Sequence, residues 1–517
     1  MAVLGGFRLS ERAYPAAPAG WTDGEFRFRE PVEAPAAAAS LPAMFRFRSF
    51  SEESEALEGN ANTIARRVYR EGTVLAAALP ARTHRVSLRL QAGSDETACT
   101  LLVLVNGAPC ARVRVPAGGD AAATFDVELD RRSLELSFAV DGEPGAAADA
   151  GWRSVCLASL DITELPRAAR ERPEVFLVAD STVQTYFDEE RPQSGWGEWL
   201  AWYLHTDHVS TRSDEPGCGT PQAVVFRGEG PVVHNRALGG RAALSYRAEG
   251  RLYTVLRDIR PGDCALIQFG INDSTPERPM RYASVPDFTA LLGEYLDAFA
   301  DRGARAVLVT PIPQLLPADA DNPIDAYADA VRALAAARQV PLIDLRALAA
   351  AYLAGLGDNI EAAYLRAPAF QYASHPDGIA DTIHLSTMGA RKLAGIVAEG
   401  LCRIEPSFTC CPEDPVGPVS LRVRELSARV CRVPVGMVVD LDWEACPGAD
   451  YWSVEKLGPD GRRYARSLTV KPSFRDAPLP AQAEAITYRV TAWRDADPSP
   501  ASEVSVRIPA TDGPLFS

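Results

Sequence analysis

The sequence has no run of about 20 apolar residues, so we expect no membrane-spanning helix among its 517 residues. Its first residues, Met-Ala-Val-Leu-Gly-Gly-Phe-Arg-Leu, lack the basic start and long apolar core of a signal peptide. This predicts a cytoplasmic protein, although a secreted mature form would look the same. Basic residues are in deficit, with 53 Lys and Arg against 68 Asp and Glu, giving a formal net charge of −15. We therefore expect neither nucleic acid nor an anionic membrane as a partner.

Several chemical signatures are also missing. The ten cysteines are scattered and include no C-x-x-C pair, which favours reduced thiols over a metal site or a disulfide framework. His205 and His208 lie near each other but have no further ligands in a matching pattern, so no metal site is predicted there. The absence of G-x-S-x-G argues against a conventional α/β-hydrolase, and the absence of G-x-x-x-x-G-K argues against an NTPase.

The chain has three consecutive regions with different hydrophobic patterns. Residues 1–165 contain short alternating runs separated by turn pairs such as Asn106-Gly107, which predict an N-terminal β-sandwich. Residues 174–405 alternate short apolar strands with alanine-rich helices, the pattern of an α/β domain with a doubly wound parallel sheet. Short strands return in residues 416–512 and predict a small C-terminal β-sandwich. Two irregular stretches of the central region, 205–231 and 355–383, are long enough to form the walls of a cleft.

Four polar segments fall at predicted strand ends or helix starts of the central region. They are Asp180-Ser181-Thr182-Val183, Asn235 to Arg241, Gln268 to Asp273, and Asp381 to Gly389. Each alone has a structural explanation, because Asp, Ser and Asn cap helices and a Gly-Gly pair permits a turn. Together they indicate a site, since ligands of open parallel sheets bind at the carboxyl ends of the strands.

The residue types in these segments suit acyl transfer. A serine nucleophile needs a base, and that base needs an orienting carboxylate. Asp381 and His384 are three residues apart and could share one face of a helical turn. The backbone N–H groups of Ser181 and Gly240 and the side-chain amide of Asn272 could stabilise an oxyanion. His375 is a rival base, but it has no aspartate three residues before it.

The motifs extend beyond single residues. They read Asp-Ser-Thr-Val-Gln-Thr-Tyr (180–186), Gly-Trp-Gly (195–197), Asn-Arg-Ala-Leu-Gly-Gly-Arg-Ala-Ala-Leu-Ser-Tyr (235–246), Gln-Phe-Gly-Ile-Asn-Asp (268–273) and Asp-Thr-Ile-His-Leu-Ser (381–386). Over roughly residues 174–402 the chain thereby resembles the SGNH (GDSL) hydrolase superfamily and, within it, the rhamnogalacturonan acetylesterase family. The N-terminal region resembles a galactose-binding module, and the C-terminal region resembles a fibronectin type III module.

The resemblance implies a role for each motif residue. Ser181 is the implied nucleophile, His384 the general base and acid, and Asp381 the residue that orients His384. Ser181, Gly240 and Asn272 are the implied oxyanion hole, and no metal or organic cofactor is implied. Two positions depart from the pattern, because Ala179 replaces a usual glycine and Ile271 replaces a frequent histidine. Alanine is tolerable at the first position if its φ stays negative.

The substrate contacts are less specified. Trp196 could stack on a sugar, but the sequence favours packing of a helix face in the core. Arg241 could attract an acidic pectic sugar or lie on a solvated helix face, and Ile271 removes a polar group near the cleft.

The resulting hypothesis is a serine carbohydrate esterase that removes O-acetyl groups from pectic, rhamnogalacturonan-type oligosaccharides. The alternatives are an SGNH esterase on acetylxylan, a lipid or a thioester, and a carbohydrate-binding protein with vestigial catalytic residues. The sequence leaves open the acetylated position, the oligomeric state and sugar binding by the N-terminal sandwich.

Overall fold

The computed structural model describes most of the chain beyond residue 78. The described residues are 45–48, 74–77, 79–92, 98–140, 155–205, 207, 210–317, 320–411, 421–433, 436–458, 460–477 and 485–508. The chain start and His208, for which expectations are given above, lie outside them. No helix among the described residues is long and apolar enough to cross a membrane.

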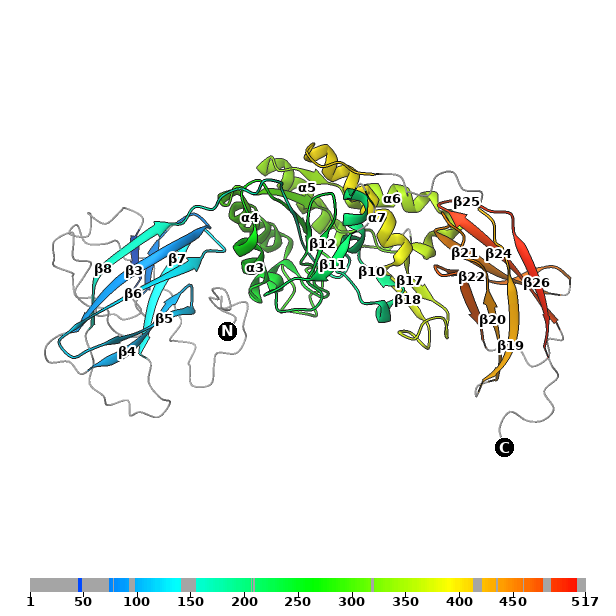
Figure 1. Ribbon diagram of the computed structural model, residues 1–517, viewed down its shortest axis with the longest axis horizontal. Coiled ribbons are helices and arrows are strands. Elements are labelled where there is room, and N and C mark those ends of the chain that lie inside the picture. Colours follow the sequence, from blue (N-terminus) through cyan, green and yellow to red (C-terminus); the bar gives the residue numbers. More distant parts are fainter. Residues whose placement is uncertain are drawn as a thin grey trace, which may run out of the picture. The chain divides into compact units, whose positions relative to one another are not determined.

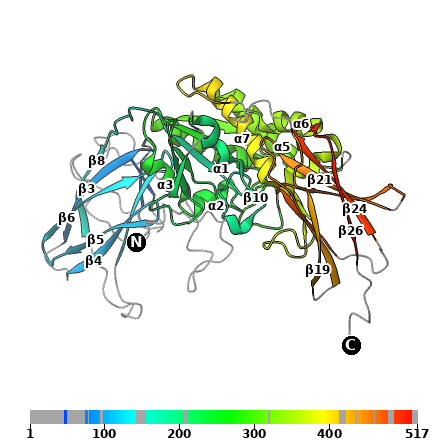
Figure 2. The ribbon, with the colours of Figure 1, turned by 45° about the vertical axis from the view of Figure 1, so that its right-hand side comes forward.

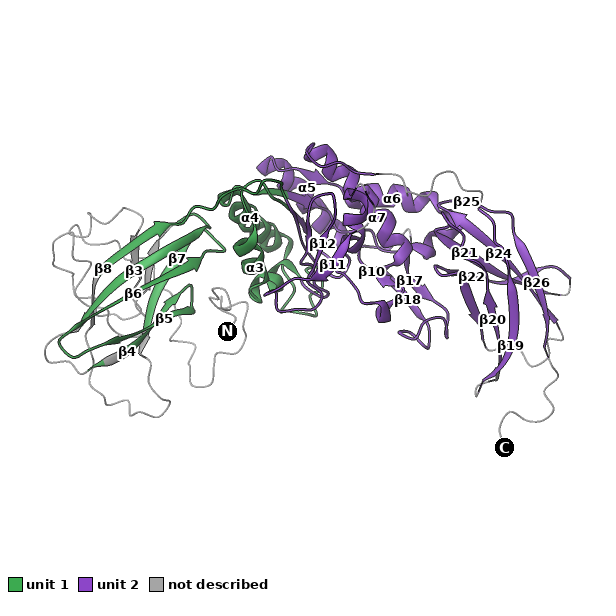
Figure 3. Ribbon diagram, in the orientation of Figure 1, with its two compact units in different colours: residues 1–173, 242–265, 273–306 green, residues 174–241, 266–272, 307–517 purple. Residues whose placement is uncertain are grey.

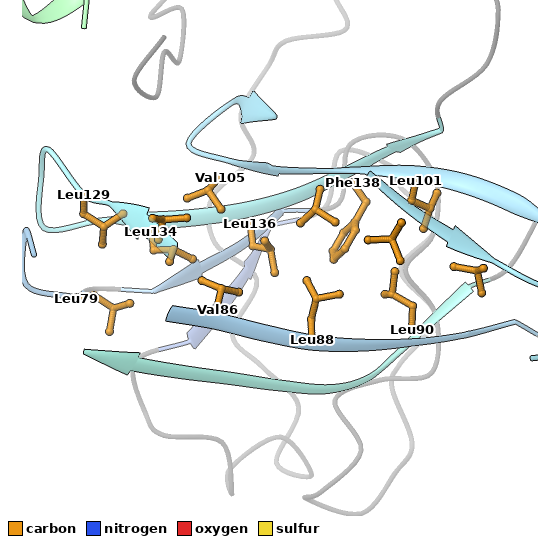
Figure 4. Packing of buried hydrophobic residues seen from close by; sticks show 14 residues of the cluster. Leu79, Val86, Leu88, Leu90, Leu101, Val105, Leu129, Leu134, Leu136 and Phe138 are labelled. Atoms are coloured by element: carbon orange, nitrogen blue, oxygen red, sulfur yellow. The ribbon is translucent and has the colours of Figure 1, made fainter. Parts of the chain in front are cut away.

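The N-terminal region forms two antiparallel sheets that share one core (Figure 1). Its strands are β1 (Phe45–Arg48), β2 (Val74–Ala77), β3 (Thr83–Ala92), β4 (Cys99–Val105), β5 (Ala108–Val115), β6 (Asp120–Glu128), β7 (Leu134–Val140) and β8 (Val155–Glu164). The sheet orders are β1-β2-β7-β4-β5 and β6-β3-β8. Side chains from both sheets, among them Leu88 and Phe138, meet in the buried cluster drawn in Figure 4. Asn106 and Gly107 both have positive φ, which confirms the predicted hairpin turn.

The central region alternates strands and helices, as predicted. Its elements are β9 (Val175–Ala179), η2 (Asp188–Glu190), β10 (Gln193–Ser194), α1 (Trp196–Leu204), β11 (Thr211–Asp214), β12 (Val224–Arg227), β13 (Val233–Asn235), α2 (Ala243–Ala248), α3 (Arg251–Asp258), β14 (Cys264–Gln268), α4 (Val285–Asp301), β15 (Arg305–Val309), α5 (Ile324–Arg338), β16 (Leu342–Ile343), α6 (Leu345–Gly355), η3 (Gly357–Ala363), β17 (Tyr364–Ala367), β18 (Ile379–Ser386) and α7 (Thr387–Ile404). The helices α1 and α7, at the two ends of this region, pack against each other (Figure 2).

The main sheet has the strand order β11-β12-β13-β9-β14-β15-β16. β13 runs parallel to β9 and β15 runs parallel to β16, but β12 is antiparallel to both β11 and β13. The prediction of a wholly parallel sheet is therefore wrong at one edge, where the stretch 205–231 supplies β11 and β12. The five remaining strands have the order 2-1-3-4-5, which puts the topological switch point between β9 and β14.

The second long stretch also contains regular secondary structure. Residues 355–383 contain η3, β17 and the start of β18, and these two strands form a small sheet with the order β10-β18-β17. This small sheet brings the segment before α1 next to the segment before α7, because Gln193 pairs with Ser386 and Ser194 with Leu385.

The C-terminal region again consists of two antiparallel sheets over one core. Its strands are β19 (Ser427–Val433), β20 (Gly436–Asp442), β21 (Tyr451–Leu457), β22 (Arg463–Thr469), β23 (Ser473–Asp476), β24 (Ala485–Arg494), β25 (Asp497–Pro498) and β26 (Ser502–Arg507). The orders are β19-β20-β23 and β22-β21-β24-β25, with β26 also pairing with β24. Trp443 and Trp452 contact each other within the shared core.

The chain's contacts divide it into two compact units (Figure 3). Unit 1 comprises residues 1–173, 242–265 and 273–306, and unit 2 comprises residues 174–241, 266–272 and 307–517. The three-domain division drawn from the sequence stays a prediction. One reason that unit 1 includes α4 is Arg302, just beyond this helix, whose guanidinium donates to the carbonyl oxygens of Ala81 and Leu129.

Candidate active site

Ser181 lies just after β9, a strand whose five residues are all buried. The chain turns sharply there, because Asp180 Oδ1 accepts hydrogen bonds from the N–H and the hydroxyl of Thr182, at 2.9 and 2.8 Å. The Ser181 carbonyl accepts a hydrogen bond from the hydroxyl of buried Tyr186 at 2.8 Å. Ser181 itself is 8% exposed. The backbone around this serine is thus fixed from both sides.

Asp381 and His384 lie on β18, not on a helical turn as the spacing predicted. In the antiparallel pair β17–β18, Tyr364 pairs with Leu385 and Arg366 pairs with Ala380. Two residues of β17 are thus matched by five residues of β18. Residues 381–384 consequently form a bulge, a feature that often re-aims a side chain. Asp381 Oδ1 stabilises the bulge by accepting from the N–H groups of Ile383 and His384, at 2.6 and 2.8 Å.

The bulge brings the three predicted residues into one hydrogen-bonded line. Asp381 Oδ2 is 2.9 Å from His384 Nδ1, and His384 Nε2 is 3.0 Å from Ser181 Oγ. A carboxylate at Nδ1 requires that nitrogen to carry the proton, so Nε2 accepts from the serine hydroxyl. Burial opposes ionisation of Asp381, but the hydrogen bonds from His384 and Ile383 outweigh it and lower the Asp381 pKa to about 2. The aspartate is therefore an anion at neutral pH.

The segment after β13 presents Gly240 beside the serine. Leu238 N–H donates to the Ala179 carbonyl at 3.0 Å, and Gly239 N–H donates to Gln184 Oε1 at 2.5 Å. A Cβ on Gly239 would lie 3.5 Å from Ser181 Cβ, which shows how near this turn comes to Ser181. Gly240 has φ of 73°, a conformation that favours glycine. Its N–H donates to no protein group among the described residues.

Asn272 follows β14, the strand on the other side of the switch point. Its Nδ2 donates to the Arg241 carbonyl at 3.2 Å, which fixes the amide and leaves its second hydrogen available. Ser181, Gly240 and Asn272 thus each come from the carboxyl end of a different one of the three neighbouring strands β9, β13 and β14. An oxyanion hole needs donors that are fixed before the reaction.

Three polar side chains that sequence reasoning left without a role hold these segments together. Asn235 Nδ2 donates to the Val183 carbonyl at 2.8 Å and to Thr185 Oγ1 at 2.9 Å. Gln268 Nε2 donates to Thr182 Oγ1 at 2.7 Å, while Gln184 binds Gly239 as described above. All three side chains lie within the quoted motifs, and the signal that could have found them is a buried amide next to a strand end.

Two of the three predicted substrate contacts do not face solvent. Trp196 is 1% exposed and its Nε1–H donates to Gln268 Oε1 at 3.0 Å, so the structure places it in the core and not at a sugar-stacking surface. Ile271 is 7% exposed. Arg241 is half-buried, and its Nη1 donates to the Gly239 carbonyl at 2.9 Å, so it supports the turn that carries Gly240. A contact between Arg241 and substrate stays a prediction.

The remaining expectations concern Ala179, His375 and metals. Ala179 ends β9 with negative φ, the condition under which alanine is tolerable there. His375 contacts Ser374 Oγ through Nδ1 at 2.9 Å, whereas the histidine within hydrogen-bond distance of Ser181 is His384. No cluster of three or more His, Cys, Asp or Glu residues suited to a metal occurs in the described part of the chain.

Comparisons with known proteins find one family model and several similar proteins. Residues 180–392 match the model of the GDSL-like Lipase/Acylhydrolase family. The chain is 32% identical over 233 residues to the rhamnogalacturonan acetylesterase RhgT of Bacillus subtilis (strain 168). The aligned region covers 44% of this chain and 89% of RhgT. The chain is 30% identical over 230 residues to the probable rhamnogalacturonan acetylesterase YesY of the same organism, covering 44% and 91%. The crystal structure of YxiM from Bacillus subtilis is similar over 64% of this chain and 80% of that one, with 23% identity and a TM-score of 0.36.

Proposed function

The chain belongs to the GDSL-like lipase/acylhydrolase (SGNH) family of serine esterases, and from that premise we propose that it removes O-acetyl groups from plant cell-wall oligosaccharides of the pectic, rhamnogalacturonan type. The observation that carries the proposal is the hydrogen-bonded line from Asp381 through His384 to Ser181, with distances of 2.9 and 3.0 Å. The names of the relatives RhgT and YesY support the sugar and the acetyl group.

In the first half of the reaction Ser181 is the nucleophile. Its Oγ attacks the acetyl carbonyl carbon while His384 Nε2 accepts the hydroxyl proton. The imidazolium that forms is stabilised by the anionic carboxylate of Asp381, which also holds the ring in the required tautomer. His384 then donates the proton to the departing sugar oxygen. The sugar leaves with a free hydroxyl, and the acetyl group stays on Ser181.

The second half repeats this proton transfer with water. His384 Nε2 removes a proton from water, the resulting hydroxide attacks the acetyl-serine, and acetate leaves as Ser181 recovers its proton. In both halves the carbonyl oxygen becomes an anion. The N–H groups of Ser181 and Gly240 and the Nδ2–H of Asn272 donate to that oxygen, and each is fixed in advance by the contacts described above. The proposed steps need no metal or organic cofactor.

The proposal is tested with two substrates and a matched pair of variants. Wild type should hydrolyse 4-nitrophenyl acetate and release acetate from acetylated rhamnogalacturonan oligosaccharides. Ser181→Ala should reduce both rates by at least about 10³-fold, because it removes the nucleophile. Ser213→Ala, at an exposed position of β11, is the control and should leave both rates unchanged.

Two results would overturn parts of the proposal. Equal rates for wild type and Ser181→Ala would eliminate the mechanism and favour a carbohydrate-binding protein with vestigial catalytic residues. A preference for long acyl chains, or for acetylated xylan over pectic fragments, would keep the esterase and replace the substrate. A panel of 4-nitrophenyl esters from acetate to decanoate, together with both polysaccharides, separates these outcomes.

A further inference from the structure

The segment 368–378 joins β17 to β18 and ends just before the bulge that carries Asp381 and His384. It is folded tightly on itself, since Phe370 N–H donates to the Pro376 carbonyl at 2.8 Å. Gly378 has φ of 83°, and a Cβ there would lie 2.8 Å from Ala369 N, so only glycine fits. The segment therefore has a defined backbone conformation.

The C-terminal region holds this segment from one side. The buried side-chain amide of Gln371 makes two hydrogen bonds to the backbone of Arg475 on β23. Gln371 Nε2 donates to the Arg475 carbonyl, and Gln371 Oε1 accepts from the Arg475 N–H. Lys471 Nζ donates to the Gln371 carbonyl and lies 4.4 Å from the centre of the Tyr372 ring. The strands β17 and β22 are also in contact. The C-terminal sheets therefore fix the backbone of 368–378 at Gln371 and Tyr372.

The other side of the segment contacts the loop that follows the serine motif. Ser374 Oγ donates to the Arg191 carbonyl at 2.7 Å. Arg191 is itself held by an ion pair with Glu198 of α1. The segment 368–378 is thus fixed between the C-terminal sheets and the loop that leads from Ser181 to α1, and it continues directly into the strand of His384.

Phe370 has an unusual backbone conformation and an exposed side chain, and the contacts of the segment explain neither. Its φ of 65° lies in the left-handed region, where a bulky side chain is strained. Phe370 is nevertheless 40% exposed, although the flanking Gln371 is buried. A strained backbone usually persists where it serves a site, and an exposed aromatic ring in a rigid setting presents a flat apolar face at little cost in entropy.

We propose that segment 368–378 is a sugar-binding subsite in which Phe370 stacks on one face of a pyranose ring of the substrate, and that Lys471 and Gln371 hold this subsite in position. The inference rests on the proposed function and extends it, because it assigns a substrate contact and gives the C-terminal region a role in substrate binding. The C–H groups on a pyranose face are apolar, so an aromatic ring binds them with the exocyclic hydroxyls left in water.

The test compares KM for acetylated rhamnogalacturonan oligosaccharides among variants of the full chain. Phe370→Asn removes the ring while keeping a residue that tolerates positive φ. It should raise KM about three- to tenfold, the range expected for one aromatic stacking contact. Its loss on the oligosaccharide should exceed its loss on 4-nitrophenyl acetate, which is too small to reach a second subsite. Phe370→Tyr keeps the ring and should stay within about twofold of wild type. Tyr464→Ala removes another exposed aromatic side chain and is the control.

A second pair of variants tests the support from the C-terminal region. Lys471→Met loses the contacts to Gln371 and Tyr372 and should raise the oligosaccharide KM with little change in kcat, whereas Lys471→Arg should restore most of the affinity. A purely structural role would instead lower kcat on both substrates and would not be rescued. Equal effects of Phe370→Asn on the two substrates, or no effect on either, would overturn the inference.

A binding measurement separates failure of this inference from failure of the proposed function. In the Ser181→Ala background, deacetylated rhamnogalacturonan oligosaccharides are titrated by calorimetry with and without Phe370→Asn. A dissociation constant that rises three- to tenfold supports the subsite whatever the enzyme hydrolyses. Identical constants, or no binding to either protein, overturn it even if Ser181 proves to be the nucleophile.

Discussion

Replacing Asp381 with asparagine tests how the carboxylate controls His384. The amide oxygen can still accept from the N–H groups of Ile383 and His384, which the carboxylate does at 2.6 and 2.8 Å. Its NH2 group then faces His384 Nδ1 and requires a lone pair there, so the ring proton moves to Nε2. In that tautomer His384 Nε2 cannot accept the proton of Ser181. We therefore expect kcat to fall by about 10²- to 10⁴-fold.

The same change has a smaller and pH-dependent effect on stability. Because the folded pKa of Asp381, about 2, lies below its unfolded value, its charge stabilises the fold above pH 4 and this contribution is lost as the pH falls towards 2. The pKa difference corresponds to about 2 kcal/mol at neutral pH. Asp381→Asn should therefore lose at most about 2 kcal/mol of stability above pH 4 and flatten the acid limb of the stability curve.

The assay follows 4-nitrophenyl acetate hydrolysis and urea unfolding on the same preparations. Asp358→Asn, at an exposed position of η3, is the matched control and should change neither quantity. If Asp381→Asn kept kcat within about tenfold of wild type while remaining folded, Asp381 would not set the tautomer of His384. The orienting role would then be wrong.

Three further outcomes follow from other contacts. Asn272→Ala removes one of the three proposed oxyanion donors and should lower kcat by about 10²- to 10³-fold with little change in KM. His234 is buried, and its ring nitrogens Nδ1 and Nε2 lie 2.7 and 2.8 Å from Glu215 and Glu174. Burial favours the neutral ring, but the two carboxylates outweigh burial and raise the pKa of His234. The charged ring therefore stabilises the fold below pH 6.5 and loses this effect as the pH rises through the folded pKa, a slope that urea titrations of His234→Gln should lack. Arg302→Met leaves buried acceptors unpaired and should lower the free energy of unfolding by about 3–5 kcal/mol, and a loss below 1 kcal/mol would contradict that role.

The sequence motifs predicted one site formed by Ser181, Gly240, Asn272, Asp381 and His384, and the structure joins Ser181, His384 and Asp381 by hydrogen bonds. For Ser181, Gly240 and Asn272 the reason is topological, because residues just after neighbouring strands of one sheet meet at the same edge. Asp381 and His384 lie instead on β18, in the small sheet. The buried run Val175–Ala179 was a strong strand signal. In contrast, all four residues of β11 are exposed, so no apolar alternation marked it and the antiparallel edge of the sheet was missed.

Other features depend on contacts that spacing does not reveal. The three-residue separation of Asp381 and His384 suits a helical turn as well as a bulge, and the pairing of β18 with β17 decided between them. Trp196 has the same local pattern in a core and at a surface, and its partner Gln268 is 72 residues away. Arg302 and Ala81 are 221 residues apart, so the link between α4 and the N-terminal strands could not be predicted locally.

That last link has a consequence for how such proteins diversify. A gene that lost residues 1–173 by recombination at the linker would still encode the Arg302 guanidinium, now without the Ala81 and Leu129 carbonyls that accept its hydrogen bonds. Shuffling the N-terminal region is therefore not neutral, and the region and the end of α4 should be inherited as a pair. A shorter enzyme with the same catalytic segments should carry a different residue where this chain has Arg302.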